Sequence, residues 1–414
     1  MEEELFKSVR DDLRPTQEWG NFLLNIGLYF YAIFACFSIS ASQISLGLAF
    51  IGLLRLIYIG KTSPKSSTLD RPFACFVLAG AFSLANANDL WRAVVEMKKF
   101  LIILLFWLPF WIRVEKSLQR RILGLFLFFG SVSMVISVLK MLYFAEGMAR
   151  LRAYGFFSLP ITFGEIQGML AILALGWLSA GESNPRVRVY VIVAFFFLLG
   201  GMLMSFTRGA WLGFAMAFLI LFAQRPKRFF PMVFALIFII IISVLTSSSF
   251  AQRFQRFDFQ SNFFRFRIWQ IGFDILQTSP VFGVGMNNVK ALYKDRVEAF
   301  DIINKEVHGH LHSNFMQILT MTGYFGFTIF FWFLSETGRF CLVAHKKITD
   351  PWQKRISRQS IAILIFFLGT GLTEYSYGDE EVSMLAFFLL GILVSPYFDE
   401  GFDGKGNNIP IAVT

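Results

Sequence analysis

Long apolar runs constrain the fold of this chain more than any other sequence feature. A helix needs roughly 20 predominantly apolar residues to cross a bilayer, and about twelve stretches approach this length. They centre on 21–38, 41–60, 71–86, 98–112, 122–144, 158–179, 189–205, 210–223, 229–246, 314–336, 359–375 and 382–397. Only 16% of the residues are charged and 56% are hydrophobic, which excludes ordinary soluble domains. We therefore predict an all-α fold, a polytopic membrane bundle of about twelve transmembrane helices.

The lysines and arginines predict which side of the membrane each loop faces. With a cytoplasmic N-terminus, 23 of the 38 Lys and Arg residues fall inside and 15 outside, in the direction of the positive-inside rule. An even number of crossings then returns the C-terminus to the cytoplasm. The expected parts are a cytoplasmic segment 1–20, helices within 21–246, a long external loop 247–312, helices within 313–397 and a cytoplasmic tail 398–414. The net charge of +10 is thus a topology signal, and we expect no nucleic-acid partner.

The apolar run 189–223 tests this topology, because it could form one long helix or two short ones. Only two crossings keep the cations that flank the run, Arg186 and Arg225, on the same side of the membrane. The break must then fall at Ser205–Gly209, the one polar and glycine-containing stretch within the run. Arg208 is therefore expected at the external interface.

The long external loop contains helix signals of its own. Ser261 or Asn262 could cap a helix that ends near Gln277, and Asn287 or Asn288 could cap a second one. The Gly-Val-Gly stretch between them follows a helix and a proline rather than a strand, so it indicates a turn and not a dinucleotide-binding motif. We expect a folded lid of two helices.

The external arginines are the candidate binding residues. Arg152 precedes the sixth span in a Gly- and Pro-containing turn, and Arg208 lies on the turn described above. Arg265 lies on the first lid helix, four residues before Trp269, so these two side chains share a helix face. Guanidinium groups that meet at one interface suit a diphosphate, because the planar fork donates paired hydrogen bonds and neutralises charge.

Other roles for the external cations stay open. Each arginine could bind lipid headgroups or pair with Glu146, Glu165 or Asp258. Lys98 and Lys99, in the external segment before the fourth span, are weaker candidates for the same diphosphate.

Three of the four histidines stand together just before the tenth span. The i, i+2, i+4 spacing of His308, His310 and His312 places three imidazoles on one face of an extended segment, as a metal site would need. Few carboxylates and no cysteine accompany them, so we expect no metal and favour one histidine as a general base. A structural alternative is that the segment caps the tenth helix through Ser313 or Asn314.

Four spaced motifs carry a family resemblance. The pattern His-Asn/Ser/Gln, nine residues, Gly-x-x-Gly is met by His312, Ser313, Gly323 and Gly326, and Arg-x-x-Gly-x-Phe-x-x-Pro by Arg152, Gly155, Phe157 and Pro160. The pattern Ser-x-x-Arg-Gly-x-Trp is met by Ser205, Arg208, Gly209 and Trp211, and Arg-x-x-x-Trp with Pro-x-x-Gly-x-Gly by Arg265, Trp269, Pro280, Gly283 and Gly285. With these motifs in order at matching topology, the chain resembles the bacterial O-antigen ligases of the O-antigen ligase/polymerase group. One departure is Ser158-Leu159 before Pro160, where many relatives have Gly-Asn.

The resemblance implies a GT-C-like glycosyltransferase of the bacterial inner membrane whose active site faces the periplasm. Its donor would be an undecaprenyl-diphosphate-linked glycan and its acceptor a sugar hydroxyl of lipid A core, in lipopolysaccharide biosynthesis, with no metal or other cofactor. His312 would be the general base for direct, inverting attack, and Arg152, Arg208 and Arg265 would hold the diphosphate. Supporting roles would fall to His310, Ser313, Asn314, Trp269, Lys98 and Lys99.

Rival functions share this scaffold or its helix number. An O-antigen polymerase or a protein O-oligosaccharyltransferase would use the same donor with a different acceptor. A transporter or flippase would also have about twelve spans, but transporters usually show related halves and carboxylates near the membrane midplane. The spans expected here hold almost no Asp or Glu, so the transporter is the weakest of these alternatives.

Overall fold

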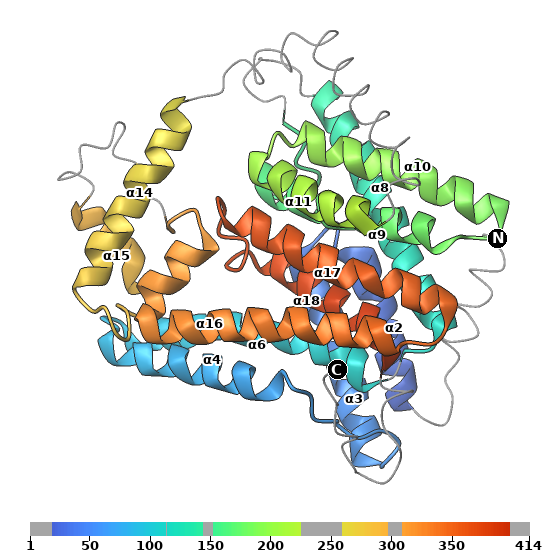
Figure 1. The fold of residues 1–414 in the computed structure, drawn as a ribbon, viewed down its shortest axis with the longest axis horizontal. Coiled ribbons are helices and arrows are strands. Elements are labelled where there is room, and N and C mark those ends of the chain that lie inside the picture. Colours follow the sequence, from blue (N-terminus) through green and yellow to red (C-terminus); the bar gives the residue numbers. More distant parts are fainter. Residues whose placement is uncertain (1–18, 113, 144–151, 225–258, 297–308, 398–414) are drawn as a thin grey trace.

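The computed structural model describes residues 19–112, 114–143, 152–224, 259–296 and 309–397, and every regular element in these ranges is a helix (Figure 1). The α-helices of the first half are α2 (Trp19–Phe34), α3 (Ile39–Tyr58), α4 (Asp70–Ser83), α5 (Leu90–Glu96), α6 (Lys98–Leu101), α7 (Trp107–Trp111), α8 (Lys116–Tyr143), α9 (Pro160–Ala180) and α10 (Pro185–Met204). Those of the second half are α11 (Arg208–Gln224), α14 (Phe259–Gln277), α15 (Asn288–Arg296), α16 (Asn314–Lys347), α17 (Pro351–Gly371) and α18 (Glu380–Val394). Two 3-10 helices, η1 (Leu84–Asn86) and η2 (Ile102–Phe106), complete the set.

Helices occupy the apolar runs that lie within the described residues. Five of them, α3, α8, α9, α10 and α16, are long and apolar enough to cross a membrane, and α2 and α11 are shorter apolar helices. The expected run 229–246, the expected tail 398–414 and all but the last two residues of the expected N-terminal segment 1–20 lie outside the described residues. The described part of the chain is thus all-helical with several candidate membrane spans, which confirms the predicted helical membrane fold, while the number of about twelve spans stays a prediction.

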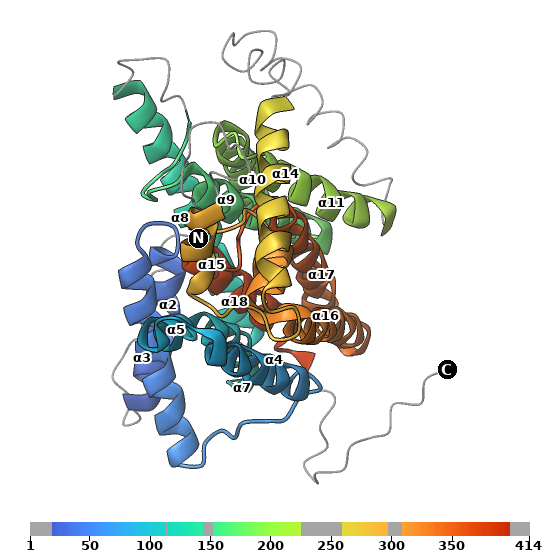
Figure 2. The same cartoon turned by 90° about the vertical axis from the view of Figure 1, so that its left-hand side faces the viewer.

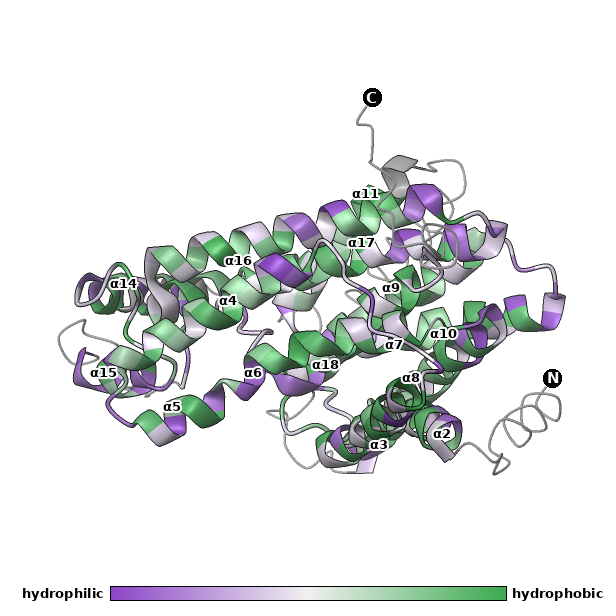
Figure 3. Ribbon diagram, turned by 90° about the horizontal axis from the view of Figure 1, so that it is seen from below, coloured by the Kyte–Doolittle hydropathy of each residue, from purple (hydrophilic) through white to green (hydrophobic). Residues whose placement is uncertain are grey.

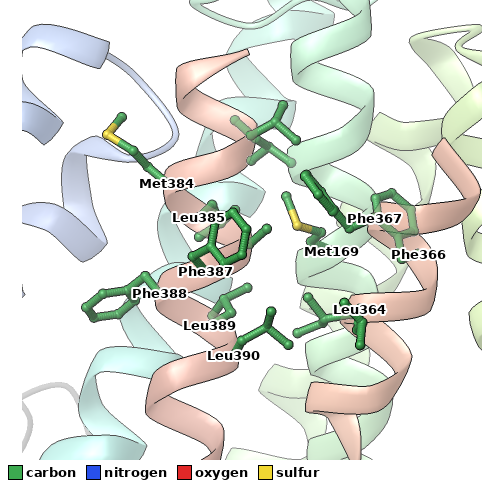
Figure 4. Packing of buried hydrophobic residues seen from close by; sticks show 14 of the residues in the cluster. Met169, Leu364, Phe366, Phe367, Met384, Leu385, Phe387, Phe388, Leu389 and Leu390 are labelled. Atoms are coloured by element: carbon green, nitrogen blue, oxygen red, sulfur yellow. The ribbon is translucent and has the colours of Figure 1, made fainter. Parts of the chain in front are cut away.

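Helix α9 forms the centre of the bundle. It contacts α8, α10, α11, α17 and α18, and nearly all of its residues are buried. In Figure 4, Met169 of α9 lies beside Phe366 and Phe367 of α17 and the row of side chains on α18. A helix that is apolar on nearly every side is stable only when it is surrounded, so the predominantly apolar sequence of α9 explains its central position.

The expected span 98–112 is not one α-helix. The chain there runs through α6, the 3-10 helix η2 and α7. Pro109 has no N–H for the carbonyl of Leu105, which interrupts α-helical bonding. Helix α18 packs directly on this stretch, because a Cβ on Gly391 would overlap the carbonyl oxygen of Phe106. The unusual backbone is therefore buried against protein, where such geometry is tolerated at membrane depth.

The described loops between the long helices fall into two groups at opposite ends of the bundle (Figure 3). At one end Lys116, the first residue of α8, pairs with Asp350 between α16 and α17, with 2.7 Å between Nζ and Oδ2. At the other end Lys98 pairs with Glu380 at the start of α18, with 2.7 Å between Nζ and Oε1. Figure 3 shows α5, α14 and α15 gathered at this second end.

The two lid helices are α14 and α15, which lie against the first part of α16 (Figures 1 and 2). Helix α14 ends at Gln277 as expected, but it begins at Phe259, so Ser261 and Asn262 lie inside the helix and do not cap it. Asn288 starts α15, and its side-chain amide donates to the carbonyls of Asn86 and Val284. That asparagine ties the lid to the segment after α4, a role that the cap prediction missed.

The turn between α14 and α15 is fastened to α16 through the backbone. The N–H of Val284 donates to the carbonyl of Thr320 (3.0 Å), and the N–H of Tyr324 donates to the carbonyl of Pro280 (2.9 Å). Gly323 breaks α16 at this point with φ 66° and ψ −174°, a conformation essentially restricted to glycine. The glycines of two motifs therefore form one joint that fixes the lid to the segment after His312.

Candidate active site

The break between α10 and α11 falls where the charge distribution predicts it. Helix α10 ends at Met204 and α11 begins at Arg208. Phe206 adopts a left-handed backbone conformation, with φ 51°. Arg152 closes over this turn, because its Nε donates to the carbonyl of Ser205 (2.8 Å) and its guanidinium contacts the Thr207 hydroxyl (3.4 Å). Two of the three predicted arginines thus share one turn.

The segment that carries Arg152 is held by α8. The Ser137 hydroxyl accepts hydrogen bonds from the N–H groups of Tyr154 and Gly155. Lys140 donates to the carbonyl of Gly155 (2.8 Å). Lys140 was not among the predicted site residues, although a cation at the external end of the fifth apolar run was a signal for it.

The first turn of α11 packs against the connection between α17 and α18. A Cβ on Gly209 would lie 2.9 Å from Cγ of Glu374 and 2.9 Å from the hydroxyl of Thr373. Only a residue without a side chain allows this approach. The backbone at Arg208 is therefore held next to the Glu374 side chain.

Helix α14 brings two predicted residues to the same place. The guanidinium of Arg265 pairs with Glu374, with 2.5 Å between its nitrogen and Oε1. The indole of Trp269 donates to the carbonyl of Leu311 (3.1 Å). The Leu311 N–H in turn donates to the Gln317 side chain (2.8 Å). The prediction that Arg265 and Trp269 share a helix face is confirmed. Trp269 bonds to the residue before His312, and Arg265 pairs with the glutamate beside His312.

His312 lies between the lid and Glu374. Its Nδ1 is 3.7 Å from Oε2 of Glu374, while Arg265 contacts the other oxygen of the same carboxylate. The backbone of His312 is left-handed, with φ 49°, which is strained for a residue with a side chain. Its ring lies 4.4 Å from the ring of His310, measured between centroids.

Ser313 and Asn314 position the turn. The Ser313 hydroxyl accepts from the N–H of Met316 and thereby caps α16, and it donates to the carbonyl of Gly371 (3.2 Å). The N–H of Asn314 donates to the carbonyl of Glu374 (3.1 Å). Both residues were expected to support the site, and in the structure they join the start of α16 to the end of α17. The structural alternative, a cap through Ser313, is therefore realised alongside the site.

Glu374 is the residue that the sequence motifs missed. Glu374 is only 3% exposed, and its carboxylate contacts both Arg265 and His312. It lies outside all four motifs, in the connection between the last two helices. Its acidic side chain, in a loop expected on the same side of the membrane as the arginines, was the only signal for it in the sequence.

A family comparison now bears on these residues. Residues 193–331 match the model of a family described as O-antigen ligase. This segment is an O-antigen ligase domain. The O-antigen ligase domain contains Arg208, Arg265 and His312, whereas Arg152 and Glu374 lie outside it. The match confirms the predicted resemblance and indicates a membrane enzyme of the glycosyltransferase type that acts on lipid-linked glycans. No curated protein matches the chain.

The two candidate lysines each pair with a glutamate. Lys98 pairs with Glu380 at the start of α18. Lys99 pairs with Glu96, with 2.5 Å between Nζ and Oε2, and its ammonium lies 6.0 Å from the centroid of the Tyr375 ring.

Tyr375 continues the ring contacts that begin at His312. Its ring centroid lies 5.7 Å from that of His310. Burial raises the pKa of the Tyr375 hydroxyl, and the Glu96 carboxylate raises this pKa further, so the hydroxyl stays protonated at neutral pH. The ring is itself only partly buried.

The carboxylates named as alternative partners do not bind the arginines in the described part of the chain. Glu146 and Asp258 lie outside the described residues. Glu165 lies in α9 and is 1% exposed, and neither carboxyl oxygen is bonded to an arginine. Arg265 does pair with a carboxylate, but this is Glu374. Glu165 is therefore a buried acid within an expected span, where the sequence led us to expect almost none.

A three-histidine metal site lies partly beyond what the structure describes. His308 is outside the described residues, and His310 and His312 are inside them. Among the residues with described positions, no group of three His, Cys, Asp or Glu side chains is placed to hold a metal ion.

Proposed function

We propose that this protein is an O-antigen ligase. It transfers a glycan from undecaprenyl diphosphate to a sugar hydroxyl of lipid A core, by metal-independent inverting attack, at the periplasmic face of the bacterial inner membrane. One observation carries the proposal: the Glu374 carboxylate contacts Arg265 and His312 at once and lies against the first turn of α11, which begins with Arg208. Residues far apart in sequence therefore supply a base and cations at one place.

His312 is the general base in this proposal. Its Nδ1 faces Glu374, so Nε2 is the nitrogen that takes the proton from the acceptor hydroxyl. The acceptor oxygen bonds to the anomeric carbon as the bond from that carbon to the diphosphate oxygen breaks. Glu374 stabilises the imidazolium that forms, by the same electrostatics that an aspartate supplies to the histidine of a catalytic triad.

The arginines serve the leaving group. The electron pair of the broken bond stays on the diphosphate, whose charge must be neutralised as it departs. Arg265 pairs with Glu374, the next residue after Arg208 packs against the same glutamate, and Arg152 is bonded to the turn that precedes Arg208. A guanidinium has five N–H donors, so a bond to a protein oxygen leaves donors on the same group for a phosphate.

The orientation of the site follows from the charge distribution. The loops that carry the arginines, the lid and Glu374 belong to the group that holds fewer of the Lys and Arg residues. The positive-inside rule places that group in the periplasm. Both termini are then cytoplasmic, and the lid helices α14 and α15 stand over the periplasmic end of the bundle.

The direct test is a lipopolysaccharide gel of a strain that lacks this chain. The proposal predicts bare lipid A core in the deletion strain and a restored O-antigen ladder after complementation. Core with a single O-antigen repeat would instead identify a polymerase. An unchanged ladder would contradict both functions and favour transfer to protein or transport.

A further inference from the structure

We propose that Tyr375, His310 and the Lys99–Glu96 ion pair form the subsite that binds a sugar ring of the acceptor glycan. This inference rests on the proposed function and assigns the second substrate to a part of the same site. The mechanism described above uses none of these four side chains.

The subsite is continuous with the proposed base. The His310 ring lies edge to face with the His312 ring at 4.4 Å and 5.7 Å from the Tyr375 ring, between centroids. The Lys99 ammonium follows at 6.0 Å from the same tyrosine ring. A ligand on these rings is therefore within one sugar ring of His312.

The neighbouring backbone holds the tyrosine and the lysine in place. A Cβ on Gly378 would overlap the Tyr375 ring, so this glycine lets the chain fold tightly over one edge of it. The hydroxyl of Tyr377 donates to the carbonyl of Lys99 (3.2 Å), which joins α6 to the connection between α17 and α18. A binding surface built on fixed elements needs little ordering when the ligand arrives.

The chemistry of the group fits a pyranose. The C–H face of a sugar ring packs on aromatic rings, and its hydroxyls need both donors and acceptors. Lys99 supplies donors and Glu96 supplies acceptors, 2.5 Å apart, with side chains 19% and 33% exposed. An anionic ligand would fit less well, since Glu96 already neutralises Lys99.

The surroundings favour an acceptor that is anchored in the membrane. Glu96 ends α5, whose outward face carries Leu90, Trp91, Val94 and Val95, all exposed. Their spacing places them on one side of the helix, and a tryptophan among aliphatic residues is typical of the membrane interface. The subsite thus lies beside a helix suited to the bilayer surface, where the lipid of a glycolipid acceptor resides.

Two substrates then reach His312 from different sides. The arginines lie beyond Glu374, on α11, on α14 and on the segment before α9, and the ring surface lies on the α5–α6 side. Base catalysis requires the acceptor oxygen within about 3.2 Å of the imidazole nitrogen. His310, which touches the His312 ring, would guide the acceptor hydroxyl to that position.

The test measures transfer with acceptor and donor concentrations varied separately, using purified lipopolysaccharide that carries the core but no O-antigen. Tyr375→Leu should raise the acceptor KM about tenfold, which corresponds to about 1.4 kcal/mol, and leave the donor KM within about twofold. Tyr375→Phe, which keeps the ring, should restore most of the acceptor affinity. Tyr58→Leu, an exposed tyrosine at the opposite end of the bundle, is the matched control and should behave as wild type.

A second variant guards against misfolding of the leucine substitution. Glu96→Gln removes the negative charge of the carboxylate that accepts hydrogen bonds in the subsite. This substitution alone should raise the KM for the acceptor glycan several-fold. An unchanged acceptor KM in both variants, or an equal rise in donor and acceptor KM, would overturn the subsite while transfer by the wild type upholds the function. A wild-type enzyme that transfers nothing to core lipopolysaccharide would overturn both.

Discussion

His312 is held in a conformation that it would not adopt alone. Its left-handed φ of 49° costs roughly 1–2 kcal/mol for a residue with a side chain. Such strain persists only where the surroundings over-determine the backbone. Here the preceding residue, Leu311, is bonded at its carbonyl by Trp269 and at its N–H by Gln317. The strained backbone therefore indicates that the His312 side chain must be held in one direction.

Glu374→Gln should slow transfer without unfolding the protein. The amide keeps the size of the side chain but cannot stabilise a charged imidazolium, so we expect kcat to fall by about 10²-fold. The acceptor KM should change little. Unchanged kcat with a raised donor KM would show that Glu374 serves Arg265 alone.

Glu165→Gln should be tolerated. A buried charge at membrane depth with no cation beside it is costly, and Glu165 forms no ion pair among the described residues. The neutral amide has nearly the same shape, so the melting temperature of the purified protein should stay equal or rise. Glu165→Lys at the same position should prevent stable insertion. A large loss of stability in the glutamine variant would mean that a charged Glu165 has a partner in the folded protein.

Helix α16 links the site to the lid through its break. The joint at Gly323 and the turn after α14 exchange backbone hydrogen bonds, so the position of α14 with Arg265 and Trp269 depends on a glycine conformation in another element. The lid is thus a fixed part of the bundle in this structure.

Gly323→Ala should destabilise the protein and remove activity together. The backbone strain alone is on the order of 1–3 kcal/mol, and the new Cβ would overlap the carbonyl of Val281. Gly338→Ala on the same helix is the control, because its Cβ would meet only an ordinary contact with Leu364 and alanine favours helix. Thermal unfolding in detergent measures both variants. Equal melting temperatures would contradict the joint.

Apolar length and loop charge predicted most of the elements, and contacts between elements account for the rest. The break at 205–209 followed from the need to keep flanking cations on one side. The 3-10 helix η2 within the apolar run 98–112 did not follow from the sequence, because it depends on the close packing of α18. Glu374 carries no local pattern: its partner Arg265 is 109 residues away, and only the tertiary fold brings the two together.

At the scale of the whole molecule, the two groups of loops define opposite faces. Asn88 lies at the end with the candidate site and Ser183 between α9 and α10 at the other, and both are exposed. In a chain whose native Cys36, Cys75 and Cys341 are replaced, Asn88→Cys should react with a membrane-impermeant maleimide in spheroplasts. Ser183→Cys should react only after lysis. The reverse pattern would place the site in the cytoplasm and contradict the orientation.

The central claim is that His312 is the base of a glycan transfer from a lipid diphosphate. Purified protein, undecaprenyl-diphosphate-linked O-antigen and core lipopolysaccharide test it in one assay, with His345→Ala at the far end of α16 as the matched histidine control. We predict that His312→Ala lowers the transfer rate by about 10²–10⁴-fold at an unchanged melting temperature, while the control variant stays active. Transfer by His312→Ala at the wild-type rate would contradict it.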